Sequence, residues 1–192
     1  SPSLDRLQEC IENGWTIPEL ANGLAAGSAS IQPLPRPRLA EPIEALRLRT
    51  ERYAKDEGSP PTVLLAPLGP TGPRSARATF ARNVLGVAGF EIIEPLMFDS
   101  VDAAADEAAD TNADVVVLCS ANEAYADLTP ALRRALEKRT RSPLLVVAGN
   151  PQNLESDLPA DEFIHSGRAL YDTLTTFQQR LGIPLDDDAP DA

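Results

Sequence analysis

Short apolar runs alternate with helical patterns from residue 62 onward. Runs short enough for strands buried on both faces lie at residues 63–66, 92–96, 115–119, 144–148 and, more weakly, 163–164. Helical patterns lie between and after them at residues 76–89, 101–110, 128–138 and 169–181; in the first, Ala76, Phe80, Val84 and Val87 share one face. Strict alternation of strand and helix predicts an α/β domain with a five-stranded parallel sheet and helices on both faces.

The chain before residue 62 has a different pattern. Leu4, Leu7 and Ile11 mark one helical face, and Thr16 and Glu19 have capping-box spacing at the start of a second short helix. A helical hairpin this small cannot make its own core. We therefore predict that a partner chain or the main domain covers its apolar surface, with the single tryptophan as a docking anchor.

Prolines dominate the next stretch. Pro33, Pro35, Pro37 and Pro42 push the residues before them away from helix, which predicts an extended strap that leads into a helix at residues 41–55. The predicted organisation is a helical hairpin at residues 1–27, a Pro-rich strap and helix at 28–61, the α/β domain at 62–185 and an acidic, disordered tail at 186–192.

Composition limits the classes of function. At 192 residues the chain suits one domain with an appendage, and a net charge of −12 argues against nucleic acid as a partner. Cys10 and Cys119 lie far apart and form neither a disulfide framework nor a zinc motif, which fits a reduced cytoplasm. No apolar run approaches about 18 residues, so we expect no membrane span and a cytoplasmic location.

The loop after the first strand is the natural place for a cofactor, because ligands of parallel sheets bind beyond the carboxyl ends of the strands. Its sequence, GPTGPRS at residues 69–75, has neither the glycine spacing of a dinucleotide fingerprint nor the Gly-Lys-Ser/Thr of a phosphate loop. Its two prolines remove backbone donors, and only Arg74 offers a charge for a phosphate.

Three other polar groupings are weaker candidates. Cys119 and His165 would form a nucleophile and base only if they met in space, and a buried core cysteine is the plainer interpretation. Asp114, Glu123 and Asp127 could imitate a metal cluster, but the strand ends lack the acids of a phosphoacceptor pocket. A basic stripe on the third helix is typical of a solvated face or, less often, a contact with an acidic partner; it comprises Arg133, Arg134, Lys138 and Arg139.

Four segments give the chain a resemblance to a known family. They are the strap QPLPRPRLAEPIEALR, the strand, loop and helix from Thr62, the segment VVVLCSANEAYADLTPALRRAL and the strand LLVVAG. Together they resemble the cobalamin (vitamin B12)-binding domain of acyl-CoA mutases, closest to the C-terminal domain of the methylmalonyl-CoA mutase small (beta) subunit. The resemblance implies a flavodoxin-like (Rossmann-like) sheet with strand order 2-1-3-4-5. It also makes the hairpin a remnant of, or lead-in from, a barrel domain.

Family members that bind cobalamin carry an Asp-x-His-x-x-Gly loop after the first strand, in which the histidine ligates cobalt. Thr71, Pro73 and Ala76 occupy those positions here. The resemblance thus implies a lost ligand, since proline has no nitrogen lone pair to offer a metal. The family's later cofactor-contacting positions align with Cys119, Ser120 and Ala121 after the third strand, with Ala148 and Gly149 after the fourth, and near His165, Ser166 and Gly167 after the fifth.

His165 is the only histidine, so it is the one candidate for a substitute ligand of that kind. In the order 2-1-3-4-5, its strand lies three strands from the first, about 14 Å at roughly 4.8 Å per strand. That separation is too great for His165 to fill the lost position. We predict a partly exposed histidine at a strand end instead.

These implications lead to a functional hypothesis. By resemblance, the chain is a non-catalytic part of a methylmalonyl-CoA mutase small subunit, and it binds no cofactor or metal. Its partner would be the large catalytic subunit, which carries adenosylcobalamin and interconverts methylmalonyl-CoA and succinyl-CoA. One alternative is a module that holds cobalamin without a protein histidine ligand. Another is a small hydrolase or transferase that uses Cys119.

Overall fold

The computed structural model describes residues 4–19, 40–139, 143–154 and 157–185. The chain divides into two compact units, Ser1–Pro37 and Arg38–Ala192. In the first unit, α1 (Leu4–Glu12) is the predicted first helix of the hairpin, and residues 17–19 are helical. The rest of the predicted second helix, the strap as far as residue 39 and the acidic tail lie outside the described residues.

The structure contains one of the two reciprocal hydrogen bonds that define the predicted capping box. The backbone N–H of Thr16 donates to Glu19 Oε2 at 2.8 Å, and the Thr16 hydroxyl donates to the same oxygen at 2.7 Å. These two hydrogen bonds, the backbone one first, lower the pKa of Glu19 below its ordinary value. Ile11, Trp15 and Ile17 are exposed, and their burial against a partner stays a prediction.

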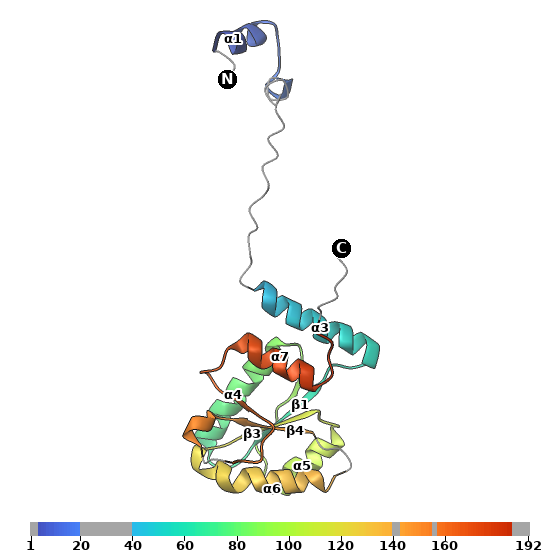
Figure 1. Cartoon of the computed structure of the whole chain (residues 1–192), viewed down its shortest axis with the longest axis vertical. Coiled ribbons are helices and arrows are strands. Elements are labelled where there is room, and N and C mark those ends of the chain that lie inside the picture. Colours follow the sequence, from blue (N-terminus) through green and yellow to red (C-terminus); the bar gives the residue numbers. More distant parts are fainter. Residues whose placement is uncertain (1–3, 20–39, 140–142, 155–156, 186–192) are drawn as a thin grey trace. The chain divides into compact units, whose positions relative to one another are not determined.

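The second unit is built on a five-stranded parallel sheet in the order β2-β1-β3-β4-β5, which confirms the predicted flavodoxin-like fold (Figure 1). Its strands are β1 (Thr62–Pro67), β2 (Glu91–Ile93), β3 (Val115–Cys119), β4 (Leu144–Ala148) and β5 (Glu162–Ile164). The prediction of a strand as far as residue 96 is wrong: β2 ends at Ile93, and Leu96 is 87% exposed. Pro95, between them, has no N–H for a ladder.

Five helices surround the sheet: α3 (Glu41–Glu57), α4 (Thr71–Val87), α5 (Val101–Asp110), α6 (Tyr125–Glu137) and α7 (Leu170–Arg180). Helices α3, α4 and α7 lie on one side of the sheet, and α5 and α6 lie on the other (Figure 1). The predicted start of α6 at residue 128 is three residues late. Pro130 suits a first turn, but it lies inside the helix, after a 3-10 turn at Asn122–Ala124.

The buried stripe of α4 differs from the predicted face. It consists of Ala78, Ala81 and Leu85, whereas Ala76 is exposed. The other three predicted residues, Phe80, Val84 and Val87, are partly buried and pack at the flank of the core. Small side chains lie under the helix because they allow its backbone to approach the sheet closely, and the larger side chains then fill the edges.

The predicted basic stripe on α6 is partly engaged by acids of the chain itself. Arg133 forms an ion pair with Asp161 at 2.6 Å and donates from Nε to the Pro159 carbonyl at 3.1 Å. Arg139 is paired with Asp106. Arg134 and Lys138 remain exposed, so only half of the stripe fits the predicted solvated face.

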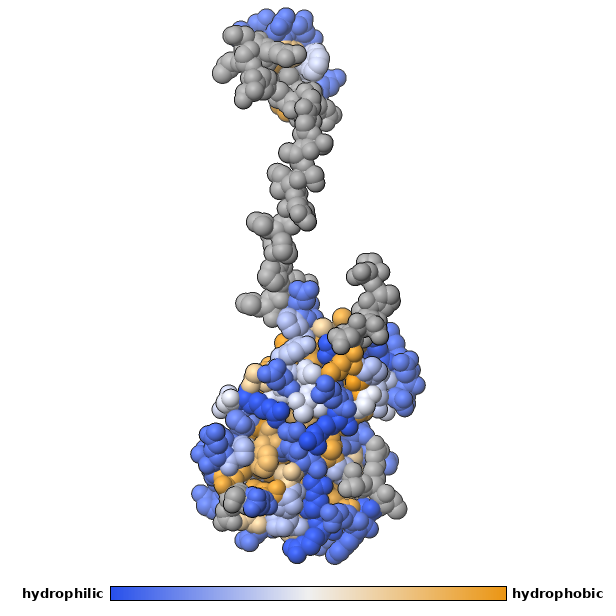
Figure 2. All heavy atoms as spheres, in the orientation of Figure 1, coloured by the Kyte–Doolittle hydropathy of each residue, from blue (hydrophilic) through white to orange (hydrophobic). Residues whose placement is uncertain are grey.

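The surface of the α/β unit has no single dominant apolar area in the view of Figure 2, where hydrophobic residues lie in separate places among hydrophilic ones. Leu48, Leu96 and Met97 are the exposed large apolar residues on α3 and after β2. Among the described helices, none combines the length and the apolar character that crossing a bilayer requires.

A buried glutamine joins the helix that precedes the sheet to the helix that ends the fold. Gln178 of α7 is fully buried and donates from Nε2 to the Leu46 carbonyl of α3 at 2.6 Å and to Thr50 Oγ1 at 3.0 Å. Leu46 is itself fully buried in the core beneath α7. Helix α3 is therefore part of the α/β unit's packing.

Replacing Gln178 tests this link. We expect Gln178→Ala to lower the free energy of unfolding by about 1–3 kcal/mol, because the Leu46 carbonyl would lose this buried donor. Urea unfolding followed by circular dichroism measures the change. The matched control is Gln179→Ala, next along α7 and exposed, which we expect to change little. Equal effects of the two substitutions would contradict the link.

Candidate functional site

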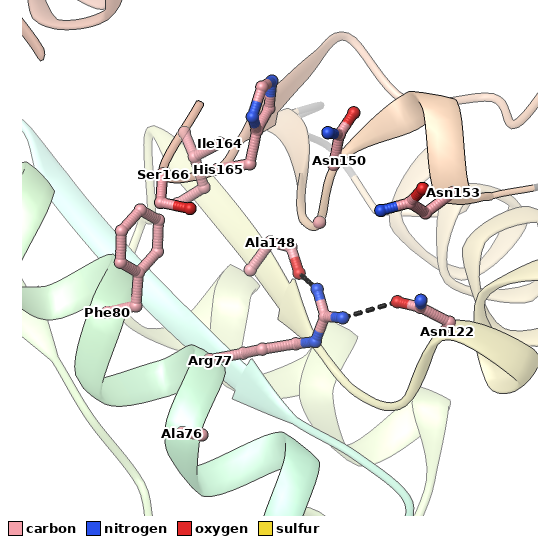
Figure 3. Close-up of a pocket in the computed structure, with 11 residues that line it drawn as sticks. Ala76, Arg77, Phe80, Asn122, Ala148, Asn150, Asn153, Ile164, His165 and Ser166 are labelled. Atoms are coloured by element: carbon pink, nitrogen blue, oxygen red, sulfur yellow. Dashed lines mark hydrogen bonds between the residues drawn. The ribbon is translucent and has the colours of Figure 1, made fainter. Parts of the chain in front are cut away.

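A pocket of about 340 Å³ opens beside the carboxyl ends of β4 and β5 (Figure 3). Residues from four segments line it: Ala76, Arg77 and Phe80 of α4, Asn122 after β3, Ala148, Gly149, Asn150 and Asn153 from the end of β4 onward, and Ile164, His165 and Ser166 from the end of β5. Predicted positions from three different strand ends thus lie near one another: Ala76, Ala148, Gly149 and His165.

The loop after β1 shapes the start of α4. Gly69 has φ +79°, and a Cβ there would lie 2.8 Å from Ser120 Oγ, so both the backbone and the space require glycine. Arg74, the one residue of this loop that offers a charge for a phosphate, donates to the Gly69 carbonyl at 2.6 Å and contacts Met97 Sδ at 3.6 Å. Its side chain is held against its own loop and is not among the residues that line the pocket.

The positions that the resemblance assigns to the cobalt-binding motif lie in the first two turns of α4. Thr71 and Pro73 are exposed and do not line the pocket, while Ala76 does. These residues do not fit cobalamin in the way the family motif does, since none of them carries a metal-ligating nitrogen. Within the described residues, no group of three or more His, Cys, Asp or Glu could hold a metal ion.

Arg77 lies across the floor of the pocket. Its guanidinium donates to the Ala148 carbonyl and to Asn122 Oδ1 (Figure 3). The guanidinium also lies 5.3 Å from the centroid of the Tyr125 ring. A Cβ on Gly149 would lie 2.9 Å from Arg77 Nη1. Arg77 thus fills space beside the end of β4, and a side chain at position 149 would require the end of the Arg77 side chain to shift.

Tyr125 completes this network from below. Its hydroxyl donates to the Ala148 carbonyl at 2.7 Å and accepts from the Ser120 backbone N–H at 3.0 Å. Burial raises the pKa of Tyr125 to about 12, against a smaller opposing effect of the hydrogen bond from Ser120. One phenol thereby joins the ends of β3 and β4.

The nucleophile hypothesis for Cys119 is not supported. The side chain is fully buried, its Sγ donates to the Val117 carbonyl at 3.5 Å, and burial raises its pKa to about 12. A thiol in this state stays protonated at neutral pH and is a poor nucleophile. The plainer interpretation, a core cysteine, is confirmed, and neither Cys119 nor Ala121 lines the pocket.

The remaining candidates lie apart from one another or in unreactive settings. Asp114 precedes β3 at the opposite, amino end of the sheet, where its carboxylate accepts from the Thr62 N–H at 2.8 Å, so it cannot join Glu123 and Asp127 after that strand. His165 follows β5 and is partly exposed, as predicted, and its Nδ1 accepts from the Gly167 N–H at 3.1 Å.

Sequence reasoning missed the polar residues that line the pocket. Arg77, Asn122, Asn150 and Asn153 belong to no recognised motif. A weak signal was present, because Asn122 and Asn150 each follow the end of a predicted strand within three residues. Arg77 offered no such signal, since only the tertiary fold brings it to Ala148, 71 residues away.

Comparison with known proteins identifies relatives among the mutase subunits. The chain is 38% identical over 157 residues to the methylmalonyl-CoA mutase small subunit of Porphyromonas gingivalis, across 80% of this chain and 24% of that protein. It is 26% identical over 149 residues to the large subunit of Propionibacterium freudenreichii subsp. shermanii, across 75% of this chain and 20% of that protein. The chain thus spans about a quarter of the length of the small subunit. No protein-family model matches it.

A cobalamin-binding protein of Desulfitobacterium hafniense is among the similar solved structures. It is 18% identical, with a TM-score of 0.44, and the match covers 74% of this chain and 71% of that one. A likeness at this level is too distant to carry over any property of that protein to this chain.

The two buried acids beneath the pocket predict a loss of stability in alkaline solution. Because burial raises the pKa of Cys119 from 9.0 and of Tyr125 from 10.0 to about 12 each, the unfolded chain releases these protons first as pH rises. We expect the free energy of unfolding to fall between pH 9 and 12, with a slope of up to about 1.4 kcal/mol per pH unit for each group.

Urea unfolding at a series of pH values measures this slope. Tyr125→Phe removes one titrating group, so we expect a shallower fall above pH 10 than in the unsubstituted chain. The difference between the two chains separates the contribution of Tyr125 from those of the other tyrosines, the cysteines and the two lysines of the sequence. Stability that is constant from pH 9 to 11 would refute the proposed burial of both protons.

Proposed function

This chain is homologous to the methylmalonyl-CoA mutase small subunits and carries a domain of the cobalamin-binding type, and from that premise we propose that it supports a partner chain without binding the cofactor itself. The partner would be the large subunit, which would hold adenosylcobalamin and interconvert methylmalonyl-CoA and succinyl-CoA. The observation that carries the proposal is Pro73, at the position that the resemblance assigns to the cobalt ligand, in a homologue of these subunits.

The pocket geometry supports the same conclusion. Arg77 occupies space next to Gly149, at a position the family uses for the cofactor, and its guanidinium is fixed by hydrogen bonds to Ala148 and Asn122. A bulky cofactor would have to displace this side chain and leave the Ala148 carbonyl with one donor fewer. The loss of the cobalt ligand and the occupation of the space beside Gly149 by Arg77 thus both oppose the binding of cobalamin.

The matches to both kinds of subunit support a heterodimeric isomerase as the setting. Part of the large subunit of Propionibacterium freudenreichii is homologous to this chain, so a large subunit of that type has a region related to this domain. In the proposed assembly, the related region of the partner keeps the cofactor, and this chain contributes interface and stability. None of the chemistry would take place on this chain.

Titration with hydroxocobalamin tests the absence of binding. We expect the visible spectrum of hydroxocobalamin to stay unchanged at micromolar concentrations of the protein, because no histidine is available in the first turns of α4. The matched control combines Thr71→Asp, Pro73→His and Ala76→Gly, which restore the family motif, with Arg77→Ala, which clears the space beside Gly149, and should allow the spectral change of imidazole coordination. A saturable change with the unsubstituted chain would favour the alternative, a module that binds cobalamin without a histidine ligand.

Co-purification tests the partner. We expect the tagged full-length small subunit to retain the large mutase chain of the same host, and Trp15→Ala in that subunit to weaken retention if the exposed hairpin surface docks on the partner. Immunoblotting or mass spectrometry of the eluate provides the readout. An eluate with no large chain would count against the complex, irrespective of the cobalamin result.

A further inference from the structure

The pocket is cationic although the chain is strongly acidic. The chain has 29 Asp and Glu residues and a net charge of −12, yet among the described residues no carboxylate lines this pocket. The lining instead offers one guanidinium, three asparagine amides, an imidazole and a hydroxyl, which belong to Arg77, Asn122, Asn150, Asn153, His165 and Ser166. Such a set of donors suits a negatively charged ligand.

Arg77 differs from those arginines in the described part of the chain that form ion pairs with acidic residues. Arg82 pairs with Glu94 at 3.2 Å, and Arg133 pairs with Asp161 at 2.6 Å. Within the described residues, the side-chain contacts of Arg77 are to neutral groups, the Ala148 carbonyl, Asn122 and Tyr125. A partly buried cation with only neutral partners is stabilised by an anion that enters its site.

Arg77 also keeps donors available. Of the five N–H groups of its guanidinium, one points to the Ala148 carbonyl and one to Asn122 Oδ1, and a side-chain hydrogen bond to Tyr125 uses a third, so at most two can serve a ligand. The charge acts at close range, since it opposes the rise in pKa that burial causes in Cys119 and Tyr125. Arg77 can therefore bind an anion without giving up its place in the fold.

The groups opposite Arg77 are oriented as donors. Asn150 Oδ1 accepts from the Gln152 N–H at 3.0 Å, which leaves the amide NH₂ of Asn150 for a ligand. His165 Nδ1 accepts from the Gly167 N–H, so the neutral imidazole carries its proton on Nε2. Figure 3 shows the side chains of Asn153 and Ser166 on opposite sides of the pocket, with Arg77 below them.

We propose that this pocket binds a small phosphate monoester, with the Arg77 guanidinium as counter-ion and the asparagine amides as further donors. The volume of about 340 Å³ suits a ligand of that size, and Phe80 and Ile164 form an apolar wall for its organic part. The proposal goes beyond the role as a supporting subunit and does not depend on it, because it needs neither cobalamin nor a partner chain.

The single histidine makes a direct test possible. His165 lines the pocket, so its imidazole protons, which no other residue shares, report on the site in a ¹H NMR spectrum of the chain. We expect inorganic phosphate at constant pH and ionic strength to shift these signals saturably at millimolar concentrations. Phenyl phosphate should bind about tenfold more tightly, because its ring buries apolar area against Phe80 and Ile164.

Three variants decide the cause of the shift. Arg77→Gln should weaken binding of both probes at least roughly tenfold, through loss of a charge-assisted contact. Asn153→Asp places a carboxylate at an exposed position of the lining and should also weaken binding, without touching the network beneath the pocket. Arg74→Gln is the matched control, with the same charge change three residues earlier on α4 but outside the pocket, and should bind like the unsubstituted chain.

Several results would overturn the proposal. One is a shift that does not saturate, or that sodium chloride reproduces at the same ionic strength, since both indicate general screening. Another is equal weakening by Arg74→Gln and Arg77→Gln. If Arg77→Gln does not fold, Asn153→Asp alone decides, and unchanged phosphate affinity in that variant refutes the site. The hydroxocobalamin spectrum is a separate readout, so failure here leaves the proposed function unaffected.

Discussion

The sheet is buried on both faces, and this constraint determines where polar chemistry can occur. Strands β1, β3 and β4 carry apolar side chains above and below, so their backbone groups are satisfied by neighbouring strands except at the ends. At the end of β4, the Ala148 carbonyl is satisfied by the Tyr125 hydroxyl and the Arg77 guanidinium. The charge and the shape of the pocket follow from these two side chains, which cover the carboxyl end of β4.

Closing the edge with side chains changes what the fold can bind. In a protein that uses such an edge for a large cofactor, the loop after the first strand supplies the ligand and small residues leave room for the rest. Here Pro73 offers no ligand, and Arg77 fills the room beside Gly149. The same network that stabilises the ends of β3 and β4 borders a pocket of about 340 Å³ that Arg77 lines, and we propose that this pocket holds a small anion in place of a corrinoid.

The pocket differs in charge from the rest of the α/β unit. Most arginines whose side chains are held in place form an ion pair with an acidic residue, as Arg133 does with Asp161 and Arg139 does with Asp106. Such pairs contribute little affinity for outside anions, because their charges are already compensated. Arg77 is placed among neutral groups, so its field extends into the pocket instead of being cancelled locally.

Much of the fold could be predicted from local sequence, because a strand buried on both faces is apolar at every position and an exposed loop is not. The bounds of β3 and β4 and those of α5 match the apolar runs and the alanine-rich pattern, and the absence of a histidine at residue 73 is plain from sequence alone. The tertiary structure alone decided that Arg77, not Arg74, lines the pocket, and that Arg133 and Arg139 are paired with acidic residues. These outcomes depend on the rotation of each helix against the sheet and on contacts between residues far apart in the chain, and neither leaves a mark on local hydrophobic periodicity.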